Sequence, residues 1–155
     1  MRCYLLRHGE AESVADSDRV RALTRRGRAD NQAVANSWHS RGDKPGVVLS
    51  SPLLRAVQTA EQVANRMSVS SVTETELLTP DADLATLLAL LEQYIDRQPL
   101  LVGHNPLLSR VLAELVGDDP DSHPYMDTSQ LVCLEMDVVA PSCAVLKYSL
   151  NPDTR

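Results

Sequence analysis

Short apolar runs alternate along the chain with longer segments in which apolar residues recur every three or four positions. Runs of about four to eight residues are typical of buried strands, and the longer pattern is typical of helices that bury one face. The pattern predicts strands at 2–7, 47–49, 70–75, 99–102, 130–138 and 143–150. It predicts helices at 25–41, 52–67, 84–95 and 106–116. Strands that alternate with helices indicate an α/β fold.

Capping residues mark several of the predicted helix ends. Thr24, Ser51 and Asp83 are expected N-caps, because their side-chain oxygens can accept hydrogen bonds from the first free N–H groups of a helix. Pro52 suits the first helical position, and Gly117 suits a left-handed C-terminal stop. These signals support four helices between the strands.

The order of elements predicts how the strands pair. Helical crossovers favour parallel neighbours, whereas the last two strands flank Ala140–Pro141 and predict an antiparallel hairpin. The expected fold class is therefore α/β, a three-layer α/β/α arrangement with a mostly parallel mixed sheet. We expect residues 1–155 to form a single domain, because a chain of this length buries a sufficient core.

Composition excludes one broad class of function. The net charge is −6 and aromatic residues make up only 3% of the chain. A nucleic-acid binder usually carries a basic surface and aromatic stacking groups, so we expect no nucleic-acid partner. Basic residues nevertheless crowd into one segment: Arg19, Arg21, Arg25, Arg26 and Arg28. This cluster is either a solvated helix face or a local patch that attracts an anionic substrate or an acidic protein surface.

Cysteine usage and hydropathy predict a cytoplasmic protein. Cys3, Cys133 and Cys143 are odd in number and lack Cys-x-x-Cys spacing, which favours small apolar core residues over disulfides or a zinc site. Strand-like sequence begins within two residues of Met1, so we expect no signal peptide. No apolar run approaches the roughly 20 residues that span a bilayer, and we expect no membrane partner.

Polar residues follow three of the predicted strands. Arg7–Gly9 ends the first, Ser50–Ser51 ends the second with Arg55 one helical turn later, and Gly103–Asn105 ends the fourth. The carboxyl ends of parallel strands meet at one edge of a sheet, so these groups should converge. Arg55 should contribute as well, since helical side chains lean toward the helix N-terminus.

The converging groups have a common chemistry. They comprise two arginines and two histidines near helix N-termini, with no carboxylate at those strand ends. Arginine offers forked donors that match phosphate oxygens, and a neutral imidazole is a competent nucleophile toward phosphorus. We therefore expect a dianionic tetrahedral ligand. No cofactor or metal is implied, because no ligand cluster with metal spacing is visible and the fixed cations already supply charge.

Three ordered segments resemble a known family. They are Arg7–Gly9, Ser51–Ala60 (Ser-Pro-Leu-Leu-Arg-Ala-Val-Gln-Thr-Ala) and Gly103–Pro106. Together they resemble the histidine phosphatase superfamily, which has a phosphoglycerate mutase-like fold. Within it, Arg21–Gly27 and Leu77–Pro80 are similar to segments of the SixA-type phosphohistidine phosphatases.

The resemblance implies a role for each matched residue. His8 would be the nucleophile that forms a phosphohistidine intermediate. Arg7, Arg55 and His104 would bind the phosphoryl oxygens, and Arg21 would be a further cation of the substrate site. His8 must then be neutral, so its other ring nitrogen should donate to a backbone carbonyl, and the arginines should lower its pKa.

The chain departs from the family pattern in one place. Many members have a glutamate proton donor where this chain reads Leu77–Pro80, which contains no glutamate. Other acidic residues stand nearby in the sequence or in the first loop: Glu76, Asp81, Asp83, Asp16 and Asp18. An alkoxide leaving group profits greatly from a general acid, whereas imidazole, with a pKa of about 6.5, leaves more easily. A site without an obvious acid favours phosphohistidine as the substrate.

Three functions follow from these observations. The preferred one is a phosphohistidine protein phosphatase that acts on a histidine-containing phosphotransfer protein in signal transduction. The alternatives are a small-molecule phosphomonoesterase on the same scaffold and a non-catalytic phosphoprotein-binding module. No role at the site is assigned to His39, His123, Thr128 or Ser129.

Overall fold

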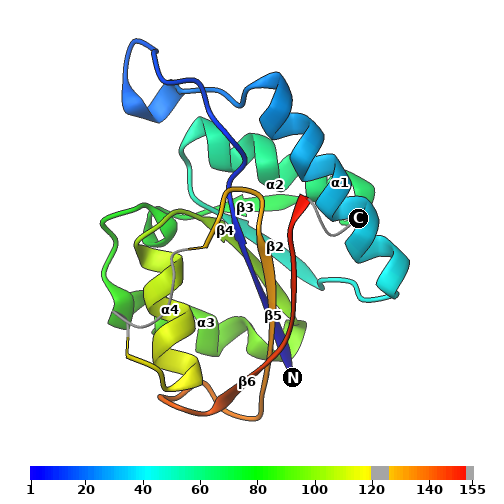
Figure 1. Ribbon diagram of the computed structural model, residues 1–155. Helices are drawn as coiled ribbons and strands as arrows, with labels where there is room; N and C mark the ends of the chain where they lie inside the picture. Colours follow the sequence, from blue (N-terminus) through cyan, green and yellow to red (C-terminus); the bar gives the residue numbers. More distant parts are fainter. Residues whose placement is uncertain (120–125, 153–155) are drawn as a thin grey trace.

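A six-stranded sheet forms the centre of the computed structural model, which describes residues 1–119 and 126–152 (Figure 1). The strands are β1 (Arg2–Arg7), β2 (Val47–Ser50), β3 (Val72–Glu74), β4 (Pro99–Gly103), β5 (Leu131–Met136) and β6 (Ala144–Leu150). Their order across the sheet is β3-β2-β4-β1-β5-β6. The first four in this order pair in parallel, and β5 pairs antiparallel with both β1 and β6. The predicted mixed, mostly parallel sheet and its terminal hairpin are confirmed.

Helices cover both faces of the sheet. They are α1 (Arg25–Arg41), α2 (Leu54–Arg66), α3 (Leu84–Tyr94) and α4 (Leu107–Val116), with short 3-10 turns η1 (Asp18–Val20), η2 (Glu76–Leu78) and η3 (Ile95–Arg97). One apolar core lies between the sheet and α1 with α2, and a second lies between the sheet and α3 with α4 (Figure 1). The predicted three-layer arrangement is confirmed.

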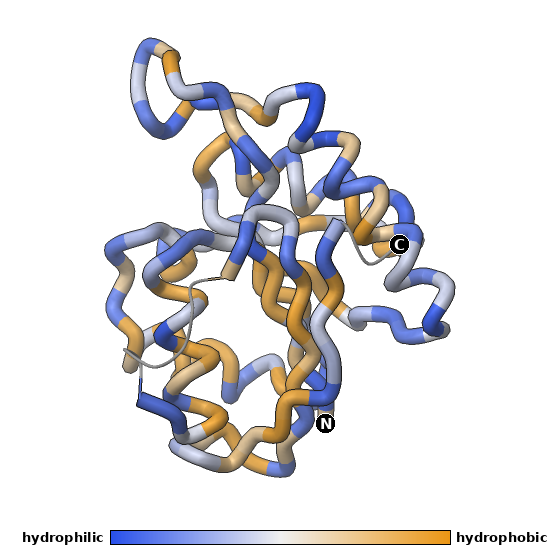
Figure 2. The backbone as a smooth tube through the Cα atoms, viewed as in Figure 1, coloured by the Kyte–Doolittle hydropathy of each residue, from blue (hydrophilic) through white to orange (hydrophobic). Residues whose placement is uncertain are grey.

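The two cores explain why the central strands are apolar without interruption. Along β1, Cys3 and Leu5 belong to the core under α3 and α4, whereas Tyr4 and Leu6 belong to the core under α1 and α2. Alternate residues of a strand face opposite sides, so a strand covered on both faces must be apolar at every position. Figure 2 shows this concentration of hydrophobic residues in the central strands. Trp38 of α1 is fully buried and packs on Tyr4 at 4.7 Å between ring centroids.

Three of the predicted caps are confirmed. The Thr24 side chain accepts from the Gly27 N–H, and the Asp83 side chain accepts from the Thr86 N–H. Gly117 ends α4 at a φ of 91°, a left-handed conformation that glycine adopts without steric cost.

The prediction that Ser51 and Pro52 begin a helix is wrong. The second helix begins at Leu54, and its N-cap Leu53 makes no side-chain capping bond. Ser51 Oγ accepts from the Leu53 N–H and also forms a hydrogen bond of 2.8 Å with Nε2 of His104. The hydroxyl is therefore used to connect two strand ends.

Two further expectations need adjustment. Cys3 and Cys133 are buried as expected, but Cys143 is exposed because it lies in the turn that precedes β6. The polar sequence from 118 to 128, between the last predicted helix and the first strand of the hairpin, is expected to be a loop, and part of it, including His123, lies outside the described residues.

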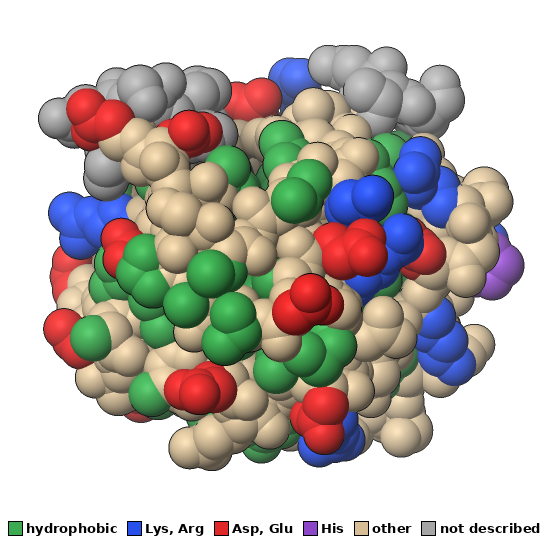
Figure 3. Space-filling model, turned by 90° about the horizontal axis from the view of Figure 1, so that it is seen from below, with side chains coloured by type: hydrophobic (Ala, Val, Ile, Leu, Met, Phe, Trp, Pro, Cys, Tyr) green, Lys and Arg blue, Asp and Glu red, His purple; other side chains and the backbone are tan. Residues whose placement is uncertain are grey.

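Exposed hydrophobic residues lie at both ends of the sheet, with Val14 on the segment from 8 to 23. The end away from the carboxyl edge carries exposed hydrophobic residues, among them Val138 and Val145. Figure 3 shows that hydrophobic side chains gather on this face between scattered acidic ones. At the other end, the segment from 8 to 23 projects beyond the sheet and α1, with η1 on its outer side (Figure 1).

No helix among the described residues is both long and apolar enough to cross a bilayer.

Candidate active site

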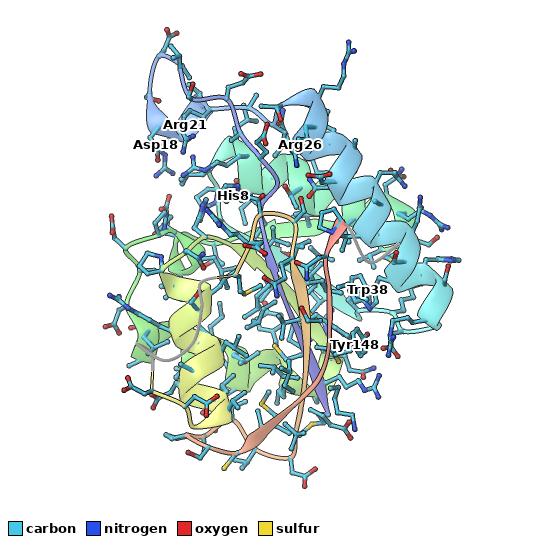
Figure 4. All side chains as sticks on the ribbon, viewed as in Figure 1. His8, Asp18, Arg21, Arg26, Trp38 and Tyr148 are labelled. Atoms are coloured by element: carbon cyan, nitrogen blue, oxygen red, sulfur yellow. The ribbon has the colours of Figure 1, made fainter. Side chains whose placement is uncertain are left out.

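The three strands that carry the polar ends are neighbours in the sheet. β2, β4 and β1 lie side by side, and Arg7 is in register with Gly103. His8 and His104 therefore follow adjacent strands, and their ring centroids are 5.0 Å apart. Arg55 lies in the first turn of α2, close enough to lower the pKa of His8. The expected convergence at one sheet edge is confirmed, and Figure 4 shows His8 below Asp18 and Arg21 of the projecting loop.

His8 is held in one orientation. It is only 8% exposed, and its Nδ1 lies 2.7 Å from the carbonyl oxygen of Gly9. A carbonyl can only accept, so Nδ1 carries the proton and Nε2 keeps a free lone pair. The pKa of His8 is lowered to about 4, chiefly by burial and also by the charges of Arg55, Arg7 and Arg21, while the hydrogen bond to Gly9 acts in the opposite direction. His8 is thus a neutral imidazole at physiological pH.

The titration of His8 provides a direct check. Folding lowers the pKa of His8 from 6.5 to about 4. Between these two pH values the ring is protonated in the unfolded chain and neutral in the folded chain. The contribution of neutral His8 to stability is therefore present above pH 6.5 and is lost as the pH falls toward 4. We expect the His8 ring resonance to titrate near pH 4 by NMR, whereas a midpoint near 6.5 would contradict the burial and the charges described here.

His104 is buried more deeply and is also neutral. It is 2% exposed, and burial lowers its pKa to about 3, with the charges of His8 and Arg55 acting in the same direction. Its Nε2 is engaged by Ser51, while its Nδ1 is buried and has no hydrogen-bond partner. One ring nitrogen is thus anchored and the other is left for a ligand.

Both arginines show the same division between anchored and unpartnered atoms. Arg7 donates from Nη1 to the carbonyl of Met126 at 2.9 Å, and Arg55 donates from Nη1 to the carbonyl of Asp18 at 2.8 Å. The Nε atoms of both are buried without a hydrogen-bond partner. A buried polar atom without a partner costs about 1–3 kcal/mol, so three such nitrogens at one edge, the Nε atoms of Arg7 and Arg55 and Nδ1 of His104, indicate a site built for an oxygen-rich anion.

One of the acidic residues of the first loop named above as a candidate, Asp18, approaches this cluster. Asp18 comes from the projecting loop, and its Oδ2 lies 3.3 Å from Nη2 of Arg55, while its Oδ1 accepts from Nε of Arg21 at 3.0 Å. Slight burial raises the pKa of Asp18, but the hydrogen bond from Arg21 and the charge of Arg55 outweigh it and lower the pKa overall. The strand ends themselves carry no carboxylate, so the sequence pattern alone did not indicate this contact.

Two of the other acidic candidates are engaged elsewhere. Glu76 pairs with Arg19 at 2.9 Å on the surface, and Asp83 caps α3 through Thr86. The hydrogen bonds from Thr86 lower the pKa of Asp83. Among these candidates, Asp18 contacts the predicted arginines Arg55 and Arg21.

A buried polar network behind His8 was not foreseen from the sequence. Thr59 Oγ1 accepts from the Gly9 N–H and from Asn31 Nδ2, while Asn31 Oδ1 accepts from the hydroxyl of Ser129. The Ser129 N–H lies within hydrogen-bonding distance of the carbonyls of Arg7 and His8. Ser129 therefore supports the backbone of the site. Asn31 and Thr59 interrupt the apolar faces of their helices, and this was the available signal.

Gly27 allows α1 to pack against this segment. A β-carbon at position 27 would lie 2.2 Å from the carbonyl oxygen of Glu10. Glycine lowers helix propensity, yet here it lets the helix backbone approach the residues that follow His8.

The arginines of the basic cluster between Arg19 and Arg28 lie in different environments. Arg21 contacts Asp18, Arg19 contacts Glu76, and exposed Arg25 and Arg28 have no side-chain partner among the described residues. Arg26 lines a cleft of about 500 Å³ that also contains Arg7, Asp30, Asp127 and Thr128. Part of the cluster thus borders the site, and part is a solvated surface.

In the described part of the chain, no three His, Cys, Asp or Glu side chains gather as metal ligands.

Comparisons with known proteins agree with this geometry. Residues 3–79 match the model of the histidine phosphatase superfamily (branch 1). The chain is 35% identical over 144 residues to the phosphohistidine phosphatase SixA of Escherichia coli, covering 88% of this chain and 86% of that protein. It is 30% identical over 129 residues to the SixA homolog of Haemophilus influenzae, covering 76% and 78%.

Solved structures show the same likeness. The protein histidine phosphatase SixA complexed with tungstate superposes with a TM-score of 0.90 at 30% identity, covering 99% of each chain. The alpha-ribazole phosphatase from Shigella flexneri superposes with a TM-score of 0.77 at 21% identity, covering 97% and 96%. The second likeness concerns the fold alone.

Proposed function

The chain belongs to the histidine phosphatase superfamily, and we propose that it removes phosphoryl groups from phosphohistidine side chains of a protein substrate. The observation that carries the proposal is the neutral, oriented imidazole of His8 beside three buried nitrogens without partners. The similarity to SixA proteins over most of both chains supports the substrate class.

We propose a reaction in two displacements. The free lone pair on Nε2 of His8 attacks phosphorus of a substrate phosphohistidine whose other ring nitrogen carries a proton. The P–N bond to the substrate breaks, and its electron pair returns to the ring, which leaves as a neutral imidazole. Water then attacks the phosphohistidine intermediate, releasing phosphate and restoring neutral His8. Arg7, Arg55 and His104 donate to the phosphoryl oxygens in both steps, with Arg21 as a further cation nearby.

The leaving group follows from the acid–base properties of the site. Asp18 has a lowered pKa and remains a carboxylate, so it is poorly suited to protonate an alkoxide at neutral pH. Imidazole leaves without strong acid assistance, because its conjugate acid has a pKa of about 6.5. This chemistry favours a phosphoramidate over a phosphomonoester. It is also why the phosphomonoesterase alternative ranks second.

Parallel assays test the proposal. We expect a phosphorylated histidine-containing carrier protein to be hydrolysed at least about tenfold faster, in kcat/KM, than any member of a panel of phosphomonoesters. EDTA should leave the rate unchanged, since arginines rather than a metal supply the charge. Faster turnover of esters would refute the substrate assignment, and loss of activity in EDTA that returns with a divalent cation would refute the metal-free mechanism.

The third candidate, a binding module, is disfavoured by the orientation of His8. Anion binding needs donors, whereas a neutral imidazole with a free lone pair offers none from Nε2 and instead suits attack on phosphorus. Wild-type protein that binds phosphate but hydrolyses none of the substrates would instead support the binding module.

A histidine-containing phosphotransfer protein of a cytoplasmic signalling pathway is the partner that we propose.

A further inference from the structure

One acidic residue contacts two of the cations proposed for the site. Asp18 receives two hydrogen bonds from Arg55, one at its backbone carbonyl (2.8 Å) and one at its carboxylate (3.3 Å). The same carboxylate accepts from Nε of Arg21 at 3.0 Å, and Arg21 donates from Nη1 to the carbonyl of Glu12. The projecting loop is thus joined to the first turn of α2 through Asp18.

The contact divides the guanidinium of Arg55 into two edges. Nη1 and Nη2 face Asp18, while Nε is buried without a hydrogen-bond partner. A guanidinium offers a second fork formed by Nε and one Nη, which matches two oxygens of a phosphoryl group. The side chain of Arg55 is only 5% exposed, against 61% for Asp18. An exposed carboxylate therefore holds the outer edge of a buried cation whose inner edge remains available.

We propose that Asp18 is a positioning residue, which holds Arg55 and Arg21 so that the Nε edge of Arg55 is presented to the phosphoryl group. The inference rests on the proposed function, because it assigns a role within the same site. Asp18 acts through the two arginines and does not contact the reacting atoms.

Two other roles for Asp18 predict different results. If Asp18 merely competed with phosphate for the arginines, removing its charge would strengthen anion binding, because one repulsive charge would be lost. If Asp18 were the proton donor, its removal would lower kcat and leave the affinity for an inert oxyanion unchanged. A positioning role instead predicts weaker oxyanion binding after the negative charge is removed, which is opposite to the Coulombic expectation.

The experiment compares Asp18→Asn and Asp18→Ala with Asp16→Asn. Asp16 is the matched control because it is exposed on the same loop, has no partner among the described residues and undergoes the same change of charge. Binding of orthophosphate and tungstate is measured by calorimetry, and kcat and KM are measured on the phosphorylated carrier. Thermal unfolding of each variant establishes that it is folded.

We expect both Asp18 variants to bind orthophosphate about tenfold more weakly and to lose about tenfold in kcat/KM, while Asp16→Asn stays within about twofold of wild type. Unchanged or tighter oxyanion binding by the folded Asp18 variants would overturn the inference, as would an equal loss in Asp16→Asn. If wild-type protein bound neither oxyanion, the proposed function would fail first, and the inference would fail with it.

Discussion

Replacing His8 by alanine should abolish hydrolysis, with a fall in kcat on the order of 10⁴-fold or more. The reason is that Nε2 of His8 is the only atom to which we assign formation of the bond to phosphorus. The measurement is phosphate release from the phosphorylated carrier, together with acid-labile radiolabel retained on the protein. Wild type should trap label on His8, and the variant should trap none.

Two controls separate chemistry from folding. His39→Ala removes an exposed histidine from α1 and should leave the rate unchanged. The His8→Ala protein should still bind orthophosphate, because the Nε atoms of Arg7 and Arg55 and Nδ1 of His104 remain. Phosphate release by His8→Ala at the wild-type rate would remove the proposed mechanism.

Replacing Arg55 by alanine should lower kcat/KM by on the order of 10³-fold. The side chain of Arg55 is only 5% exposed, and its Nε has no hydrogen-bond partner. The positive charge therefore acts in an environment that water screens poorly. Arg55→Lys should recover only part of the loss, since an ammonium group keeps the charge but lacks the planar fork.

Arg66→Ala is the matched control for this prediction. Arg66 lies in the last turn of the same helix and hydrogen-bonds to Asn36, away from the strand ends. Its removal should change kcat/KM by less than about twofold. If Arg55→Ala and Arg66→Ala behaved alike while both proteins remained folded, Arg55 would have no part in binding the phosphoryl group.

The sequence predicted the parts of the site that follow from local pattern and sheet topology. Apolar runs that stop at Arg7–Gly9 and at Gly103–Asn105 define strand ends, and parallel pairing places them at one edge. The position of Arg55 follows from its place in the first turn of a helix. These inferences need only periodicity and the direction of the strands.

The remaining parts depend on contacts that local pattern does not determine. Asp18 reaches Arg55 across 37 residues through an irregular loop, whose path no periodicity describes. Ser51 has the residue type of a cap, but its hydroxyl is engaged by His104, which follows a strand that is distant in sequence. Asn31 and Thr59 become partners only when two helices pack together. In each case tertiary packing decides which of several possible partners a polar group takes.

The hydrogen-bond network of Thr59, Asn31 and Ser129 has a consequence for the energetics of turnover. It ties the backbone after β1 to α1, to α2 and to the start of β5 through buried hydrogen bonds. Ordering these groups has a conformational-entropy cost, which is met when the chain folds and not again when each substrate arrives. Binding energy from the protein substrate therefore remains available to align its phosphohistidine with His8. Because the network is already ordered, its rearrangement should add little to the activation free energy of the reaction.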